Sequence, residues 1–301
     1  MVIVLGSINA DGVMKTASLP IEGETRVDGE YSLYPGGKGA NQAVAARHAG
    51  AGVAFIGAVG DDELAEPALA GLRDARIDIS QIARRTDAST GYAIVMVNDS
   101  GQNAIVVASG ANRLVTADQL PADWLNSKIT VVLQAEIPMQ VNAAAARTAK
   151  QNGARTILNL APYATPGPGL LEAIDILILN EIEAAQLAAD RGDTADFRSA
   201  AQTVAHEFGT TVILTLGADG AVAFVHDAVF EMPALPITPT DTTGAGDAFV
   251  GALAAALDNG MTIEDALRRA TTAGSLACLK LGAQSALPSR DDIERMLIKG
   301  N

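Results

Sequence analysis

The chain has 301 residues, of which 49% are hydrophobic and 19% charged, and this composition excludes an intrinsically disordered protein. Its 35 acidic and 21 basic residues give a net charge of −14, which disfavours binding to nucleic acids or anionic membranes. The single cysteine, Cys278, excludes an internal disulfide. The N-terminus has no basic region and only a short apolar run at 2–5, so no secretory signal is expected. We therefore expect a cytoplasmic globular protein.

Short β-branched runs alternate along the chain with longer Ala-rich segments of helical period. The expected strands are 2–5, 53–57, 130–134, 155–159, 175–179 and 211–216, and the expected helices are 38–49, 62–74, 139–152, 181–189, 197–208, 247–257 and 264–280. Continuous apolar strands with helices between them are typical of a parallel sheet that is covered on both faces. We predict an α/β fold with a doubly wound, mainly parallel sheet, which binds ligands at the carboxyl ends of its strands.

Two stretches, 12–35 and 87–110, interrupt this alternation, because they contain strand-like pieces and turns without an intervening helix. Antiparallel hairpins fit both stretches. We interpret them as a small β-sheet lid on a main α/β domain that is made of residues 1–11, 36–86 and 111–301, with approximate boundaries.

The stretch "DTTGAGDAF" at 241–249 places two glycines and a carboxylate at the start of an expected helix. Gly244 and Gly246 lack a Cβ, so their N–H groups can approach an anion, and a helix start attracts negative charge. If the helix begins near Asp247, this carboxylate can accept the proton of a hydroxyl that attacks phosphorus. The alternative interpretation is that Asp247 only caps the helix.

A second glycine-rich helix start, "PGGKGANQAVAA" at 35–46, carries Lys38 and Asn41. Neither stretch is a dinucleotide-binding or Walker A sequence, because Phe249 replaces a glycine in the first and no Ser or Thr follows Lys38 in the second. Either turn alone could be structural. Together, one with a cation and one with a carboxylate, they favour an anion site.

Five stretches of the chain resemble the ribokinase-like family of carbohydrate and nucleoside kinases. They are "GSINAD" (6–11), "GGKGANQAVAA" (36–46), "NEIEAA" (180–185), "TLGADG" (215–220) and "DTTGAGD" (241–247). The similarity runs from Val2 to about Pro288. It implies ATP-dependent phosphorylation of a sugar primary hydroxyl, with conversion of D-ribose to D-ribose 5-phosphate as the first expectation. It also implies Mg²⁺ and K⁺ as cofactors and a homodimer formed through the lid.

The same resemblance assigns roles to individual residues. Asp247 would be the catalytic base, and the amides of 243–246, including Gly244, Ala245 and Gly246, would form the anion hole. The sugar would contact Asn9, Asp11, Gly37, Lys38, Asn41, Glu136 and Asp247. ATP would contact Asn180, Thr215, Gly217, Gly220 and Gly246. K⁺ would bind Asp241, Thr243 and carbonyls around 278–282, with Gly282 among them, and Asn180 and Glu183 would organise Mg²⁺ through water.

Several alternatives stay open. Asn180 and Glu183 are also ordinary choices for capping a helix. Within the family, the substrate could be a fructose-like sugar or a nucleoside, although a purine nucleoside needs an apolar slot and the residues above are polar. A non-catalytic sensor on the same fold is expected to lose Asp247 or the glycines, which this chain keeps. A nicotinamide-dependent oxidoreductase needs a GxGxxG sequence where "GSINAD" stands.

Overall fold

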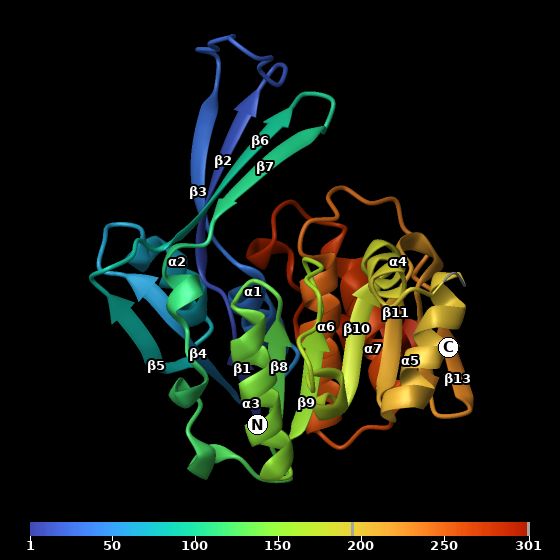
Figure 1. The fold of residues 1–301 in the computed structure, drawn as a ribbon. Coiled ribbons are helices and arrows are strands. Elements are labelled where there is room, and N and C mark those ends of the chain that lie inside the picture. The colour runs from blue at the N-terminus through green and yellow to red at the C-terminus, as the bar shows by residue number, and fades with distance from the viewer. Residues whose placement is uncertain (194–195, 300–301) are drawn as a thin grey trace.

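The computed structural model of the chain describes residues 1–193 and 196–299. They form a larger sheet that is flanked by helices and a smaller sheet that projects from one end of it (Figure 1). The strands of the larger sheet are, in spatial order, β13 (Ala228–Met232), β12 (Ala221–Val225), β11 (Thr211–Thr215), β10 (Ile176–Asn180), β9 (Arg155–Asn159), β8 (Thr130–Gln134), β1 (Val2–Leu5), β4 (Val53–Gly60) and β5 (Asp78–Arg85). The helices are α1 (Lys38–His48), α2 (Ala65–Asp74), α3 (Met139–Gln151), α4 (Glu181–Asp190), α5 (Phe197–Phe208), α6 (Ala245–Asp258), α7 (Ile263–Ala277) and α8 (Arg290–Lys299).

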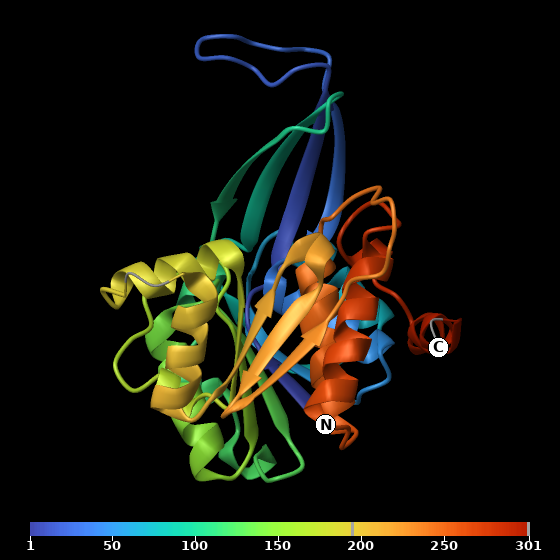
Figure 2. The same cartoon turned by 90° about the vertical axis from the view of Figure 1, so that its right-hand side faces the viewer.

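The strands from β11 to β5 pair in parallel, whereas β12, near one edge, pairs antiparallel with both β11 and β13. Successive side chains of a strand point to opposite faces, so both faces need cover. Val2 and Val4 of β1 belong to the core under α1, α2 and α6, whereas Ile3 and Leu5 belong to the core under α3, α4 and α5. Figure 2 shows the resulting three layers edge-on. The predicted doubly wound α/β fold is confirmed.

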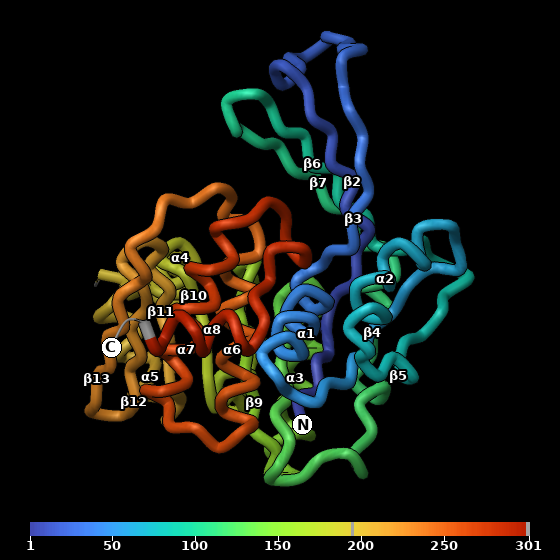
Figure 3. Tube along the Cα trace, turned by 180° about the vertical axis from the view of Figure 1, so that it is seen from behind, coloured from blue at the N-terminus to red at the C-terminus, as the bar shows by residue number. Residues whose placement is uncertain are grey.

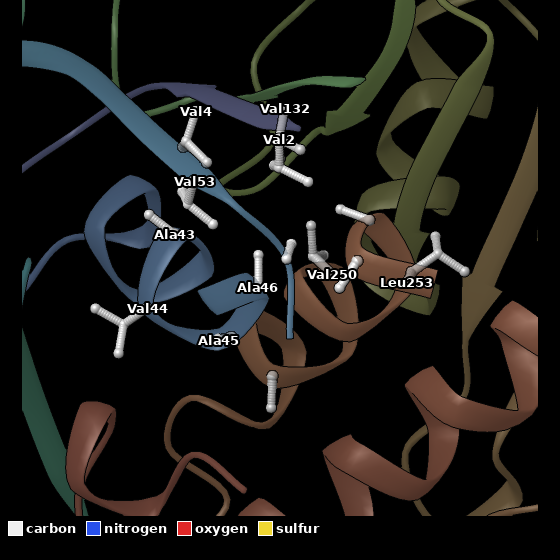
Figure 4. Close-up of a cluster of buried hydrophobic side chains, with 14 of the residues drawn as sticks. Val2, Val4, Ala43, Val44, Ala45, Ala46, Val53, Val132, Val250 and Leu253 are labelled. Carbon is white, nitrogen blue, oxygen red and sulfur yellow. The ribbon is translucent and has the colours of Figure 1, made fainter. Parts of the chain in front are cut away.

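Helices α1 and α6 pack closely against each other on one face of this sheet (Figures 3 and 4). Their contact is made by small and β-branched side chains such as Ala43, Ala46 and Val250. Gly251 of α6 allows the close approach, because a Cβ there would lie 2.4 Å from Ala45 Cβ. This crossing brings the two glycine-rich helix starts of the sequence together.

The smaller sheet has the strand order β3 (Glu30–Gly36), β2 (Asn9–Thr16), β6 (Gly91–Asn98) and β7 (Asn103–Ala108). β2–β3 and β6–β7 are the two antiparallel hairpins, and β2 pairs in parallel with β6. The sheet begins at Asn9, so Asn9 and Asp11 lie on its first strand. In the described part of the chain, no helix has the length and apolar character that crossing a bilayer requires.

Several element boundaries differ from those expected. α2 begins at Ala65 rather than at 62, because the Asp62 carboxylate accepts hydrogen bonds from the amide and the hydroxyl of Thr90 at the base of the smaller sheet. α7 ends at Ala277 rather than at 280, because the next carbonyl, that of Cys278, accepts hydrogen bonds from the amides of residues 240 and 241. Strands β5, β12 and β13 and helix α8 were not among the expected elements.

Candidate active site

The carboxylate of Asp247 lies at the start of α6, facing α1. The helix begins at Ala245, two residues earlier than expected, and its N-cap residue is Gly244 with φ of 76°. Asp247 is 6% exposed. Its Oδ1 accepts a hydrogen bond from Gln42 Nε2 at 3.0 Å, and its Oδ2 accepts one from Asn41 Nδ2 at 3.0 Å. Asp247 is therefore not the residue that caps α6, and the interpretation of this side chain as a simple cap is wrong.

The backbone amides ahead of Asp247 differ in whether they are free. The amide of Thr243 donates to Asp241 Oδ1 at 2.9 Å, and that of Ala245 donates to the carbonyl three residues earlier at 3.2 Å. In the part of the chain that the structure describes, the amides of Gly244 and Gly246 have no acceptor. A Cβ on Gly246 would meet no atom within 4 Å, so open space lies beside this amide. Both donors are therefore unengaged, and the space beside Gly246 is open to an anion.

Glu136, which follows β8, ties the start of α1 to the end of β1. Its Oε2 accepts hydrogen bonds from the Lys38 amide at 2.9 Å and from Ser7 Oγ at 2.6 Å. Gly37, the N-cap residue of α1, has φ of 87°. A Cβ there would lie 2.9 Å from the Asn9 amide nitrogen, so only glycine fits without movement of the backbone. The predicted sugar ligands from three separate segments thus meet in one place.

Charges are concentrated in this region. Burial raises the pKa of Asp11 to about 7, with further contributions from the negative charges of Glu136 and Asp247. Asp11 Oδ1 is buried without a hydrogen-bond partner. Burial lowers the pKa of Lys38, but the carboxylates of Asp247, Glu136 and Glu183 outweigh this effect and leave it above its ordinary value. The ammonium of Lys38 is therefore held charged among carboxylates.

The amide group of Asn9 is held in one orientation by Asn112. Asn112 Nδ2 donates to Asn9 Oδ1 at 2.8 Å and to the Ile8 carbonyl at 3.1 Å, and its Oδ1 accepts from the Ile8 amide at 2.9 Å. Since the Asn9 oxygen is engaged, its amide nitrogen is the atom left to bind a ligand. Asn9 therefore offers a hydrogen-bond donor.

The residues predicted to contact the nucleotide and Mg²⁺ lie along the neighbouring strands. Asn180 and Thr215 are paired in register at the carboxyl ends of β10 and β11. Asn180 Oδ1 accepts from the Glu183 amide at 2.8 Å and Glu183 Oε2 accepts from the Asn180 amide at 2.8 Å, which is a capping box. Gly217 and Gly220, with φ of 55° and 95°, form the turn that follows β11. The helix-capping role of Asn180 and Glu183 is thus present.

The predicted cation loop is organised by Asp241. Its Oδ1 accepts from Thr243 Oγ1 at 2.7 Å, and its Oδ2 accepts from the Gly282 amide at 2.8 Å. Burial raises the pKa of Asp241, but these hydrogen bonds outweigh burial and hold the pKa below its usual range. Asp241, Thr243 and Gly282 are therefore brought together as expected, next to the amides at the start of α6.

Other side chains in the site were not anticipated. Gln42 Nε2 donates to Asn159 Oδ1 at 3.0 Å, and Gln284 Nε2 donates to Asn41 Oδ1 at 3.0 Å. Ser7 Oγ donates to Glu136. The side chains that were not anticipated form a polar layer beneath the predicted residues: Ser7, Gln42, Asn112, Asn159 and Gln284. The available signal was a polar residue in an apolar run, as Gln42 is in "ANQAVAA". A buried polar group needs a partner, and that partner is usually another polar group of the site.

Comparisons with known proteins agree with this geometry. The family described as pfkB family carbohydrate kinase matches residues 1–290. The chain is 37% identical over 295 residues to the ribokinase of Haemophilus influenzae, covering 96% of this chain and 95% of that protein. It is similar to the structure of Arabidopsis thaliana ribokinase complexed with ribose and ATP, with a TM-score of 0.88, 32% identity and 98% of each chain covered. It also matches the bifunctional ribokinase/ribose-5-phosphate isomerase A of Fructilactobacillus sanfranciscensis at 36% identity over 297 residues, where it covers 97% of this chain and spans 55% of that protein's length.

The three-layer fold and these matches define the class of the protein as a carbohydrate kinase, a phosphotransferase that acts on an alcohol group. Because the family match covers nearly the whole chain, the chain belongs to the pfkB family of carbohydrate kinases.

Proposed function

We propose that this kinase transfers the γ-phosphoryl group of ATP to the primary hydroxyl of D-ribose and releases D-ribose 5-phosphate and ADP. The observation that carries the proposal is the meeting of the buried Asp247 carboxylate with two unengaged amides, those of Gly244 and Gly246, beside the polar residues of α1 and β2. The likeness to ribokinases, one of them solved with ribose and ATP, supports this choice of substrates.

In the proposed reaction Asp247 accepts the proton of the sugar hydroxyl as its oxygen attacks the γ-phosphorus. The new O–P bond forms while the bond from the γ-phosphorus to the β–γ bridging oxygen breaks, and the electron pair leaves with ADP. The amides of Gly244 and Gly246 stabilise the negative charge on the transferred group. Ala245 contributes the helical turn between them rather than a free donor, because its amide is engaged. Positioning and charge neutralisation supply most of the catalysis in phosphoryl transfer.

The sugar-binding set would be Asn9, Asp11, Gly37, Lys38, Asn41 and Glu136. Glu136 accepts from the Lys38 amide, Asn41 donates to Asp247, and Asn112 donates to the Asn9 oxygen. A polyol with a hydroxyl missing would leave one of the sugar-binding groups unpaired. The nucleotide would lie along Asn180, Thr215, Gly217, Gly220 and Gly246. The positive φ values of Gly217 and Gly220 let the chain turn closely at this position.

A divalent cation fits the charge of the site. The carboxylates of Asp247, Glu136 and Glu183 interact with one ammonium, that of Lys38, so an unaccompanied triphosphate would be repelled. Asp11 adds a further acidic group, which interacts with Glu136 and Asp247. Among the described residues no group of three or more His, Cys, Asp and Glu side chains could hold a metal ion directly. We therefore assign Asn180 and Glu183 to holding Mg²⁺ through water molecules, in addition to their capping role. Bound Mg²⁺ would neutralise charge on the phosphates.

A monovalent cation fits beside the anion hole. Asp241 and Thr243 bring carboxylate and hydroxyl oxygen atoms to one loop, where the Gly282 amide donates to Asp241, and oxygen is the ligand that K⁺ takes. The loop contacts the start of α6 where the Ala245 amide donates to the Thr242 carbonyl at 3.2 Å. We expect replacement of K⁺ by Na⁺ to lower the turnover number, and equal rates in the two salts would contradict this site.

The small sheet would act as the lid and as the interface of a homodimer. Its β6 and β7 strands expose Ile94, Ile105, Val106 and Val107 at 45%, 55%, 68% and 47%. Ile94 and Val106 are cross-strand partners and share one face of the sheet, whereas Ile105 and Val107 lie on the other face. Exposed apolar side chains that lie side by side, as Ile94 and Val106 do, mark an interaction site. Gel filtration should give a dimer for the native chain and a monomer for Val106→Lys.

We also propose a cytoplasmic location, which suits a chain with one free cysteine.

The experiment that tests the substrate is a screen of purified protein with ATP and, separately, ribose, fructose, 2-deoxyribose and adenosine. The proposal predicts that ribose has the highest kcat/KM. Turnover of fructose or adenosine without turnover of ribose would replace ribose with one of the alternative substrates and leave the kinase assignment intact.

A further inference from the structure

Gln42 is a fully buried polar side chain that contacts the candidate base. It lies on α1, directly after Asn41, and is 1% exposed. Its Nε2 donates to Asp247 Oδ1 at 3.0 Å and to Asn159 Oδ1 at 3.0 Å. Its Oε1 is buried without a hydrogen-bond partner. Burying an amide whose oxygen is unsatisfied has an energetic cost, so a purely structural role is better filled by an apolar residue.

The orientation of Gln42 is fixed from the central sheet. Asn159 ends β9, and its Nδ2 donates to the backbone carbonyl of Ile178 in β10 at 3.3 Å. Asn159 therefore presents its oxygen to α1, and only the amide nitrogen of Gln42 can satisfy it. The same nitrogen has a second hydrogen, which points to Asp247. A chain of hydrogen bonds thus runs from the backbone of β10 through two side chains to the carboxylate.

The packing of α1 against α6 sets the length of this contact. Gly251 lies one turn after Asp247 on α6, and a Cβ there would lie 2.7 Å from the Gln42 carbonyl oxygen and 2.6 Å from the Ala46 amide nitrogen. The two backbones therefore touch one turn away from the Gln42–Asp247 hydrogen bond (Figure 4 shows the neighbouring Ala46 and Val250).

We propose that Gln42 is the positioning residue of the base: it holds Oδ1 of Asp247 from the sheet side, so that Oδ2 is the oxygen that accepts the substrate's proton. The contact of Oδ2 with Asn41, a residue of the proposed sugar site, places this second oxygen on the substrate side. The inference rests on the proposed role of Asp247 as base. Gln42 itself touches neither sugar nor nucleotide in this assignment.

The test compares the steady-state kinetics of wild type, Gln42→Met and Gln42→Glu over a range of pH with the sugar that the substrate screen selects. Met matches the length of Gln but donates no hydrogen bond. We expect kcat of Gln42→Met to fall about 10- to 100-fold, since misplacement of a reacting group by about 1 Å costs on this order. The KM values for sugar and ATP should stay within about threefold, because only the transition state uses the positioned base.

The pH profile separates positioning from loss of structure. A donor to a carboxylate favours its charged form, so the acid limb of the kcat profile should move to higher pH in Gln42→Met and further in Gln42→Glu. Lys38 on α1 and Asp11 on β2 are the charged groups that interact with Asp247, and Glu136 interacts with both of them. All three are present in every variant. Asn142→Leu, which removes a buried amide of α3 hydrogen-bonded to the Gln134 carbonyl, is the matched control and should lose stability without a change in profile.

Each outcome has one meaning. A wild-type kcat in Gln42→Met, or a lower kcat with an unchanged acid limb and a matching loss of folded protein, overturns the role of Gln42. Asp247→Asn is measured in parallel. If Asp247→Asn is inactive while Gln42→Met behaves as wild type, only the inference about Gln42 fails; if Asp247→Asn turns over normally, the proposed base fails first.

Discussion

At the scale of single residues, the two glycines before Asp247 have different roles. Gly246 has no positive φ and open space where a Cβ would lie, whereas Gly244 has φ of 76° and a Cβ there would lie 3.0 Å from Ala283 Cα. Gly246→Ala should therefore keep the free energy of unfolding within about 1 kcal/mol of wild type. Its methyl group would lie beside a free amide of the proposed anion hole, so kcat should fall by about 100-fold.

Gly244→Ala is the comparison for this substitution, because it forces a left-handed backbone on a residue with a Cβ. It should lower the free energy of unfolding by about 1–2 kcal/mol. Chemical denaturation of both variants measures the change in the free energy of unfolding, and initial rates measure the change in kcat. Full activity in Gly246→Ala would show that the transferred group does not approach this amide.

Asp11 makes the stability of the free protein depend on pH in an unusual direction. Burial, with the charges of Glu136 and Asp247, raises its pKa from 3.8 to about 7. The folded state therefore binds more protons than the unfolded state between these values, so the contribution of Asp11 to stability is lost as pH rises through this window. Asp11→Asn should stabilise the protein relative to wild type more at pH 8 than at pH 5, by no more than about 4 kcal/mol.

Urea denaturation of wild type and Asp11→Asn at the two pH values measures this difference. A stabilisation that is equal at both values, or larger at pH 5, would show that Asp11 is ionised in the folded protein across the whole range. If Asp11 binds the sugar as proposed, ribose should bind more weakly to Asp11→Asn, because a neutral amide would replace a carboxyl group that accepts hydrogen bonds from hydroxyls.

At the scale of elements, the crossing of α1 and α6 brings the two halves of the site together. Gly251→Ala would place a methyl group 2.4 Å from Ala45 Cβ, and neither helix backbone can yield locally. Overpacking of this kind costs about 1–3 kcal/mol, and the separation of the helices should also lower kcat by lengthening the Gln42–Asp247 contact. Gly52→Ala, where a Cβ meets no atom within 4 Å, is the control.

Thermal unfolding and initial rates report both effects of Gly251→Ala. A variant that is destabilised but keeps the wild-type kcat would show that the helix spacing does not control the position of the base.

The elements that could be predicted from the sequence are those with a clear pattern of apolar residues. Strands β1, β4 and β8–β11 are continuous apolar runs that are buried on both faces, and such runs leave little choice of structure. β5 is an edge strand with the mixed pattern "DISQIARR", and the Ala-rich β12 suits a helix as well as a strand. Both are fixed as strands by pairing, β5 with β4 and β12 with β11 and β13, and local propensity does not predict such pairing.

At the scale of the whole molecule, the candidate residues of the site could be named from the sequence because five motifs of the chain resemble those of the ribokinase-like family. The polar layer beneath these residues could not be predicted from the sequence. Gln42, Asn112 and Asn159 come from different elements, and their hydrogen bonds exist only once the sheet order and the helix crossing are set. The pKa of Asp11 likewise depends on burial in the folded chain.

The proposed phosphoryl transfer requires Asp247 to accept the proton of the sugar hydroxyl at the start of α6. The most direct test is Asp247→Asn, assayed with ribose and ATP by stopped-time turnover and by calorimetric titration of each ligand. The account predicts that turnover falls about 10²- to 10⁴-fold, because a general base contributes on this order, while the dissociation constants change only a few-fold. Turnover near the wild-type rate would contradict it.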